Sequence, residues 1–364
     1  MHPSIKILLV LLAVCVRVGM VYSQDDRRFR IFQFPSDKIP TIDGNSDDWD
    51  IVGEAYVVGI NEMFDDRIDS NRHHKADPAN LDVKVKVGWV NGINRIYILY
   101  EAYDNYWDFS LSGLHNDIFE VVIDGDQSGG PFINAFHPNK QLSPMDAYFS
   151  FHGVHAQNYH IFTPARGKDW AMVWGSQPWI KELPYANASY KYDFQPGEPG
   201  RLTLEFWITP FDYAGPEGPS RSVESTLTEN KDIGLSWAVI DYDDVNKPVG
   251  NDGFWNLSRE RTMYGDANYL LPFTLMPLEP QYLKPIDARW SFNVVDMNRR
   301  MVAFTDESIG EVTSWKWDFG DGNFSTEQHP SHRYSTAGLY IVTLNVEGPL
   351  GESSLSKVWD VAIK

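Results

Sequence analysis

An alternation of apolar and polar residues over positions 81–87, within the run LDVKVKVGWV at 81–90, constrains the fold more than any other feature of this sequence. In an extended strand the apolar residues lie on one face and the charged residues on the other, which is the pattern of a half-buried β-strand. Asn91-Gly92 then predicts a hairpin turn, because both residues tolerate positive φ, and residues 95–103 predict the return strand. Further strands are expected at residues 118–123, 159–162, 202–208, 233–240 and 253–257. Long helical periodicity is hard to find after residue 24, so the predicted fold class is all-β, of the sandwich type.

Prolines at positions 272, 277, 280 and 285 divide the chain. Such a run is stiff and is typical of an interdomain linker. A second set of alternating segments follows from Trp290 to the end of the sequence. The sequence therefore predicts two β domains, a large sandwich at 24–275 and a small one at 287–364, joined by a Pro-rich linker over 276–286.

The first residues predict export from the cell. Lys6 precedes an apolar run over residues 7–16, and a small residue, Ser23, ends the segment. This pattern indicates a secretory signal peptide over residues 1–23, which would place the chain outside the cell or on its surface. A retained anchor helix is the alternative, but a membrane span needs about 20 apolar residues and Arg17 ends this run sooner.

Charge and composition narrow the classes of partner. The formal net charge is −19, whereas binding to nucleic acid needs a basic footprint on the protein, so nucleic acids would be repelled and anionic membrane surfaces are disfavoured as partners. Neutral partners and calcium remain open. Aromatic residues make up 14% of the chain, and aromatic rings both build cores and stack on sugar rings. The only cysteine, Cys15, lies in the predicted signal peptide, so the mature chain would have no disulfide.

The string Trp317-Asp318-Phe319-Gly320-Asp321-Gly322 raises the question of a metal or phosphate loop, because Asp-Phe-Gly also marks the metal-holding loop of protein kinases. The sequence has no kinase Gly-rich loop, no catalytic H-R-D string and no helical lobe. An EF-hand fails as well, because Asp318 and Asp321 have the wrong spacing and no Glu closes the loop. The alternation of Trp315, Trp317 and Phe319 instead predicts a half-buried strand, followed by a Gly-rich turn without catalytic chemistry.

This string, together with Phe304-Thr305-Asp306, His332-Arg333-Tyr334 and Gly338-Leu339-Tyr340, resembles the PKD domain, a small immunoglobulin-like sandwich of extracellular proteins. The resemblance covers residues 289–364. It implies a spacer or a contact module for other extracellular or cell-surface proteins. The function would then reside in the upstream domain.

Residues 39–50, IPTIDGNSDDWD, predict an apolar strand entry, a turn and a corner in which Trp49 plugs the core. The string also resembles the opening of the family 9 carbohydrate-binding modules and their relatives. Further matches follow in the same order at residues 116–126, 205–210 and 253–255, with additional length over residues 130–199. The resemblance implies a β-sandwich that binds sugars, often beside structural calcium.

Two groups of acidic residues are the candidate calcium ligands under this resemblance. Asp124 and Asp126 flank a glycine in one turn, and Asp241 and Asp243 form a second group. Carboxylates are the hard oxygen ligands that Ca²⁺ prefers. Solvated turns without any ion are the competing interpretation of both groups.

The candidate sugar-binding residues are aromatic rings for stacking and polar side chains for the sugar hydroxyls. The rings are Trp107, Trp170, Trp174 and Trp179, and the polar partners are Asn116 and Glu205. Core packing is the competing interpretation of each tryptophan, and strand bracing that of Asn116 and Glu205.

His152, His155 and His160 form a further cluster of a kind that can hold zinc or copper. On one strand, His152 and His160 would share a face and His155 would not, which weakens a single site. Ordinary surface or core histidines are the default interpretation.

The leading prediction is a secreted, non-catalytic protein that binds polysaccharide or oligosaccharide by aromatic stacking, in bacterial polysaccharide degradation. A glycoside hydrolase or polysaccharide lyase on the same sandwich is the alternative. Hydrolysis needs two carboxylates about 5–9.5 Å apart, and no string singles out such a pair. A haem-binding relative is a further alternative, for which Met145 and Met172 are weak candidate ligands.

Overall fold

The computed structural model describes residues 26–66, 75–109, 116–130, 141, 143, 152–243, 252–258, 260–283 and 285–364. The predicted signal peptide and Met145 lie outside these residues. Within them, no helix has both the length and the apolar character needed to cross a membrane.

Strands dominate the described residues, and the all-β prediction is confirmed. The first set of strands is β1 (Phe29–Gln33), β2 (Val57–Gly59), β3 (Phe64–Asp65), β4 (Leu81–Val90), β5 (Ile93–Asp104), β6 (Ile118–Asp124), β7 (Gln157–Phe162), β8 (Ala171–Val173), β9 (Ala186–Tyr192), β10 (Gly200–Ile208), β11 (Phe211–Tyr213), β12 (Val223–Glu224), β13 (Asp232–Asp241), β14 (Gly253–Asn256) and β15 (Leu271–Leu275). The second set is β16 (Trp290–Asp296), β17 (Met301–Asp306), β18 (Ser314–Asp318), β19 (Phe324–Ser325), β20 (Ser331–Arg333), β21 (Gly338–Gly348) and β22 (Gly351–Ile363). Short 3-10 turns connect them: η1 (Ser46–Trp49), η2 (Glu54–Tyr56), η3 (Ile60–Glu62), η5 (Pro178–Lys181), η6 (Pro219–Arg221), η7 (Arg261–Tyr264), η8 (Ala267–Tyr269) and η9 (Pro280–Tyr282).

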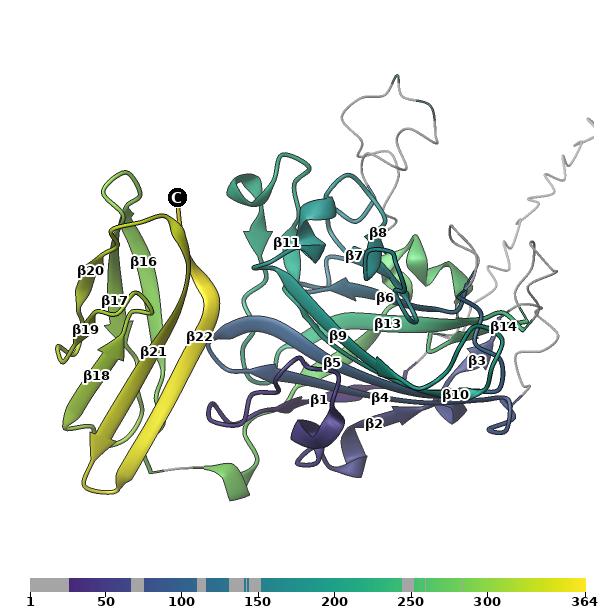
Figure 1. Ribbon diagram of the computed structural model, residues 1–364, viewed down its shortest axis with the longest axis horizontal. Helices are drawn as coiled ribbons and strands as arrows, with labels where there is room; N and C mark the ends of the chain where they lie inside the picture. Colours follow the sequence, from purple (N-terminus) through teal and green to yellow (C-terminus); the bar gives the residue numbers. More distant parts are fainter. Residues whose placement is uncertain are drawn as a thin grey trace, which may run out of the picture.

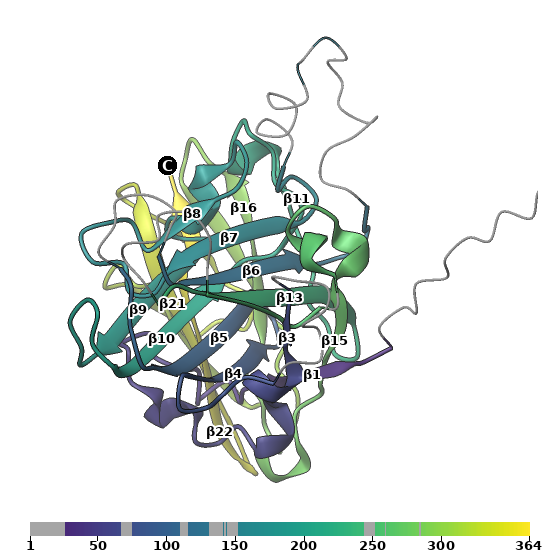
Figure 2. The same cartoon turned by 90° about the vertical axis from the view of Figure 1, so that its right-hand side faces the viewer.

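The first set of strands forms a β-sandwich, whose layers are seen in Figure 2. One sheet has the order β8-β7-β6-β13-β15 and the other the order β4-β5-β10-β9. β1 joins the two sheets in parallel, because residues 29–31 pair with β15 and residues 32–33 pair with β4. The sandwich is therefore closed along β1, and β8 and β9 end the two sheets on the other side.

The hairpin of β4 and β5 forms as its sequence pattern predicts. Leu81, Val83, Val85 and Val87 are buried, whereas Lys84 between them is exposed. Gly92 in the turn has a φ of 80°, a conformation that glycine adopts without steric cost.

The space between the two sheets is filled by large rings and branched chains. Tyr100 of β5 stacks on Phe119 of β6 with ring centroids 4.3 Å apart, and Phe119 also contacts Phe206 of β10. Such offset ring pairs add about 0.5–1.5 kcal/mol beyond the burial of their apolar area. Trp237 of β13 completes this layer without exposure to solvent.

The corner at residues 39–50 differs in one respect from the predicted strand entry. Residues 38–43 have no strand conformation, and β1 lies earlier in the chain. Trp49 does plug the interior, as expected, and is fully buried against Phe34. Gly44 has a φ of 84° and lies so close to the Tyr190 backbone that a Cβ would come within 2.8 Å of it.

The second set of strands forms a smaller sandwich from the sheets β16-β17-β20 and β19-β18-β21-β22. Trp317 and Phe319 are buried in it, and the two acids beside them complete the turn. Asp318 accepts a hydrogen bond from the Gly320 N–H (2.9 Å), and Asp321 accepts one from the Asn323 N–H (3.1 Å). Asp321 also contacts His332 Nε2 at 2.8 Å. These acids therefore have structural partners.

The two sandwiches lie against each other, with β22 on the side that faces the larger one (Figure 1). One apolar cluster is continuous between them, and it includes Phe34, Trp49 and Trp207 from the larger sandwich and Ile286 and Trp290 from the smaller. Met276 and Tyr282, from the segment between β15 and β16, pack against the same cluster.

Candidate functional site

Carboxylates gather at one end of the larger sandwich. Asp104 ends β5, Asp117 precedes β6 and Asp241 ends β13, and an oxygen of each lies within 4.8 Å of the others. The antiparallel pairing of Ile118 with Ile240 places Asp117 and Asp241 side by side. All three side chains are buried.

Backbone N–H groups hold two of these carboxylates, Asp104 and Asp117, in place. Asp104 accepts from the Tyr106 N–H at 2.9 Å. Asp117 accepts from the Asp108 N–H at 2.6 Å with one oxygen and from the Tyr242 N–H at 2.9 Å with the other. The positions of Asp104 and Asp117 are therefore set by the chain around them.

Burial disfavours the ionised form of the carboxylates in this cluster. It raises the pKa of Asp104 to about 7, and the charge of Asp243 adds to this rise. Burial, followed by the charges of Asp104 and Asp241, holds the pKa of Asp117 well above its usual value. Crowded buried carboxylates of this kind ionise readily only when a cation compensates them.

The predicted calcium ligands divide between two places. Asp241 belongs to this cluster. The charge of Asp243 raises the pKa of Asp104, and the Asp243 N–H donates to Asp252 at 3.1 Å. Asp124 and Asp126 lie in a separate turn at the other end of β6. There Asp124 accepts from the Gly129 N–H (2.8 Å) and Asp126 from the Ser128 N–H (3.0 Å). Burial raises the pKa of Asp124 to about 6.

The structure places three of the predicted sugar-binding residues in the interior. Trp107 is 1% exposed and stacks on Phe194 with ring centroids 4.5 Å apart. Asn116 is buried beside Asp117. Glu205 is fully buried and accepts hydrogen bonds from the 43–45 turn and from Trp49. Core packing and strand bracing, the competing interpretations, therefore describe these side chains in the structure.

The other three predicted rings are half-buried along the strand that ends the first sheet. Trp170 precedes β8, Trp174 follows it and Trp179 lies in η5. The Trp170 indole N–H donates to the Lys181 carbonyl (3.1 Å), and that of Trp179 donates to the Gly215 carbonyl (3.1 Å). We call these three tryptophans, with β8 and η5, the β8 edge.

Tyrosines border the β8 edge where the two sheets meet. The Tyr190 hydroxyl of β9 lies 2.8 Å from the Phe162 carbonyl and 3.2 Å from the Trp170 carbonyl, so it bridges the open side of the sandwich. Tyr185 contacts Trp179 edge to face, with centroids 5.1 Å apart. Tyr192 is 37% exposed. Aromatic rings are thus concentrated at this side of the molecule.

The three histidines do not lie on one strand: His160 is in β7, whereas His152 and His155 precede it. His152 and His160 are both buried near Trp174, with centroid distances of 6.4 and 6.0 Å to its ring. Burial lowers the pKa of His152 to about 3. His155 is exposed and contacts the Asp212 carbonyl instead. Met172 pairs with His160 across β7 and β8.

Sequence reasoning missed Asp104 and Asp117 as members of the acidic cluster. Each stands at a strand end, and that signal was visible, but the residues are distant in the sequence from Asp241. Only the pairing of β6 with β13, and the approach of β5 from the other sheet, brings them together.

Comparisons with known proteins agree with this architecture. A model of the PKD domain matches residues 294–363. The Pre-pro-metalloprotease PrtV of Vibrio cholerae is 38% identical over 66 residues, which are 18% of this chain and 7% of that protein. Collagenase ColA of Bacillus cereus is 44% identical over 50 residues, which are 14% of this chain and 5% of that protein. The chain thus spans less than a tenth of the length of these curated relatives.

Among solved structures, a family 9 carbohydrate-binding module from Caldicellulosiruptor kristjanssonii in complex with cellotriose is similar over 71% of this chain and 97% of that chain. The sequence identity is 12% and the TM-score 0.42. The PKD1 domain of Vibrio anguillarum Epp is similar over 22% of this chain and 95% of that chain, at 29% identity and a TM-score of 0.20. Residues 294–363 therefore form a PKD domain.

Proposed function

We propose that this chain is a non-catalytic carbohydrate-binding protein whose sandwich binds polysaccharide or oligosaccharide at the β8 edge. The observation that carries the proposal is the set of half-buried tryptophans there, Trp170, Trp174 and Trp179. A half-buried indole is anchored on one side and offers apolar ring surface on the other, which suits the C–H face of a sugar. A sandwich of this fold in complex with cellotriose is consistent with that role.

Anchoring by the protein makes these rings suitable for binding. Because the Trp170 and Trp179 N–H groups already donate to backbone carbonyls, their ring orientations are set before a ligand arrives. A ligand then loses little affinity to the ordering of side chains. Lys181 and Asp169, an ion pair at the same edge, provide polar groups for sugar hydroxyls.

The ligand class follows from charge. At a net charge of −19 the protein repels polyanions, so neutral glycans are the expected partners. Their use in polysaccharide degradation, and export by a signal peptide over residues 1–23, belong to the same proposal.

Affinity gel electrophoresis against a panel of soluble neutral and acidic polysaccharides tests this function. We expect retardation by at least one neutral glycan and a loss of that retardation in Trp174→Ala and Trp179→Ala. Trp315→Ala is the matched control, because Trp315 is also half-buried but lies in the PKD domain. Migration that no glycan changes, with calcium present, would overturn the proposal.

We also propose that the buried cluster of Asp104, Asp117 and Asp241 binds a structural Ca²⁺ ion. Their oxygens are close enough to share one cation, and their burial makes an ion-free, fully ionised cluster unfavourable. Carboxylate oxygens held by backbone N–H groups suit the hard ligand set of Ca²⁺. The ion would join the ends of strands from both sheets.

A further inference from the structure

The PKD domain is clamped to the sandwich by Arg95, a residue of β5. Its guanidinium lies 3.9 Å from the centroid of the Trp207 ring, donates to the Val358 carbonyl at 2.5 Å and pairs with Asp360 at 3.3 Å. Arg95 is 3% exposed. A register shift in the pairing of β21 with β22 occurs next to Asp360, and such a bulge changes the direction of a side chain.

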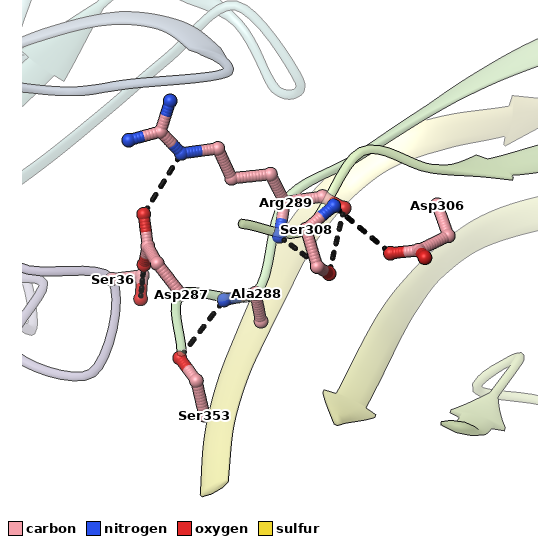
Figure 3. Close-up of polar contacts among 7 residues, drawn as sticks. All are labelled: Ser36, Asp287, Ala288, Arg289, Asp306, Ser308 and Ser353. Carbon is pink, nitrogen blue, oxygen red and sulfur yellow. Dashed lines mark hydrogen bonds and ion pairs between the residues drawn. The ribbon is translucent and has the colours of Figure 1, made fainter. Parts of the chain in front are cut away.

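A second contact holds the start of the PKD domain against the sandwich (Figure 3). Ser36 of the sandwich approaches Asp287 at 3.5 Å, and Asp287 in turn accepts from Arg289 at 2.8 Å. The next residue, Ala288, donates its N–H to the Ser353 hydroxyl of β22 at 3.0 Å. The Arg95 contact therefore reaches β22 directly, and the Ser36 contact reaches it through the hydrogen bond of Ala288.

Between these contacts the two domains enclose a crevice of about 580 Å³. One wall is the outer face of β22, where Ser354 and Ser356 lie on the same side of the strand. The other wall is a cross-strand row on the outer face of the second sheet, Asn187, Trp207 and Tyr97. A volume of this size falls within the usual range for small-ligand sites.

We propose that this interdomain crevice is a second glycan-binding site, which exists only while the PKD domain is docked on the sandwich. It lies apart from the β8 edge, and neither domain alone has both walls. The site takes a neutral, hydroxyl-rich chain.

Hydrogen-bonding groups in the crevice fit such a ligand. Within the described residues, the Asn187 amide and the Ser354 hydroxyl make no hydrogen bond to protein, so both are available to sugar hydroxyls. Ser356 shares its hydroxyl with Thr343 at 2.7 Å. Hydroxyl and amide groups both donate and accept, as a sugar does.

The remaining lining argues against anionic and purely apolar ligands. Arg95 is the one basic residue that lines the crevice among the residues described, and Asp360 already neutralises it, so an anion finds no free cation. Half-buried Ile39 and Ile42 provide apolar surface for the C–H faces of sugar rings. A purely apolar ligand would leave the amide and the serines unpaired.

Isothermal titration of the full-length chain with cellohexaose and laminarihexaose tests this inference, which shares the ligand class of the proposed function but not its site. We expect two sites for the oligosaccharide that binds. Filling the crevice with Ser354→Trp, or removing its amide with Asn187→Ala, should abolish one site or weaken it at least tenfold. Ser331→Trp, on the exposed far sheet of the PKD domain, is the matched control. Thermal unfolding confirms that each variant is folded.

The same titrations distinguish failure of the β8-edge proposal from failure of the crevice proposal. If Trp174→Ala and Trp179→Ala abolish all binding while Asn187→Ala and Ser354→Trp leave it unchanged, the crevice is not a site and the β8 edge stands. If the crevice variants lose all binding and the β8-edge variants none, the crevice stands alone. Absence of heat with both oligosaccharides overturns the crevice proposal.

Discussion

Glu205 is the buried carboxylate on which the N-terminal corner depends. One oxygen accepts from the Trp49 indole at 2.8 Å, and the other accepts from the N–H groups of Asp43, Gly44 and Asn45 at 3.2, 2.8 and 3.0 Å. Burial raises its pKa, although these hydrogen bonds oppose the rise. The residue therefore holds a turn from one part of the chain against a strand from another.

Replacing Glu205 by Gln should destabilise the protein by about 3 kcal/mol, because an amide NH₂ would face backbone N–H groups that need an acceptor. Chemical denaturation measures the loss. Glu217→Gln, at an exposed position, should change the free energy of unfolding by less than about 0.5 kcal/mol. Equal effects of the two substitutions would show that Glu205 does not hold the corner.

Glu120 predicts a pH dependence of stability. Burial raises its pKa to about 7 from 4.5, while the Asn158 amide donates to it at 3.0 Å and His160 lies opposite it in β7. A raised folded pKa means that the folded state holds the proton more tightly. The contribution of Glu120 is therefore fully present below pH 4.5 and is lost as the pH rises through about 7.

Between these limits the free energy of unfolding of the wild type should fall by about 3 kcal/mol more than that of Glu120→Gln. Urea titrations at fixed chelator concentration over this range measure the difference. Because Asp104 and Asp124 titrate in the same direction in both proteins, the comparison isolates Glu120. Parallel pH profiles would contradict the burial argument.

At the scale of elements, strand ends and strand edges carry the chemistry of this molecule. The ends of β5, β6 and β13 form the acidic cluster. Two of the tryptophans flank β8 and the third lies in η5, and the bulge in β22 brings Asp360 to Arg95. Regular strand interiors instead supply the packed core.

Calcium should raise the unfolding temperature of the wild type relative to chelated protein. At a free calcium concentration about 100-fold above Kd, the free energy of unfolding should increase by about 2.7 kcal/mol. Asp117→Asn should remove this shift because it takes one charge from the cluster, whereas Asp169→Asn, at an exposed ion pair, should keep it. Differential scanning calorimetry makes the comparison, and an equal calcium response in both variants would contradict the proposed Ca²⁺ site.

Arg95→Ala should lower the free energy of unfolding by about 3–5 kcal/mol, because Asp360 would lose its partner in a partly buried interface. The contact between the two domains should weaken as well. The radius of gyration from small-angle scattering should increase. Arg201→Ala, which removes an exposed guanidinium over Tyr103, serves as the control and should leave the scattering unchanged. An unchanged radius in Arg95→Ala would mean that other contacts suffice to dock the PKD domain.

The elements also show where sequence reasoning succeeds. Alternation at 81–90 predicts β4 because burial on one face requires it, and Asn91-Gly92 predicts the turn because of its backbone chemistry. Local patterns could not place Glu205 or Trp107, since burial depends on which distant strand covers a residue. Both the acidic cluster and the interdomain crevice need strand register and domain docking, which no local pattern contains.

For the whole molecule, the structure describes a PKD domain docked on its neighbour through Arg95 and a continuous apolar cluster. A flexible spacer would have a loosely bound, more polar interface. The two sandwiches therefore form one body, with a proposed glycan site at the β8 edge and a proposed second site in the crevice.

Glycan binding at the β8 edge is tested most directly by the affinity of the full chain for the neutral polysaccharide that retards it in gels. Isothermal titration should show that Trp170→Ala, Trp174→Ala and Trp179→Ala, combined in one folded variant, lower the affinity of this edge at least tenfold, or about 1.4 kcal/mol. Trp315→Ala should bind as the wild type does. Unchanged affinity and stoichiometry in the triple variant would contradict the claim.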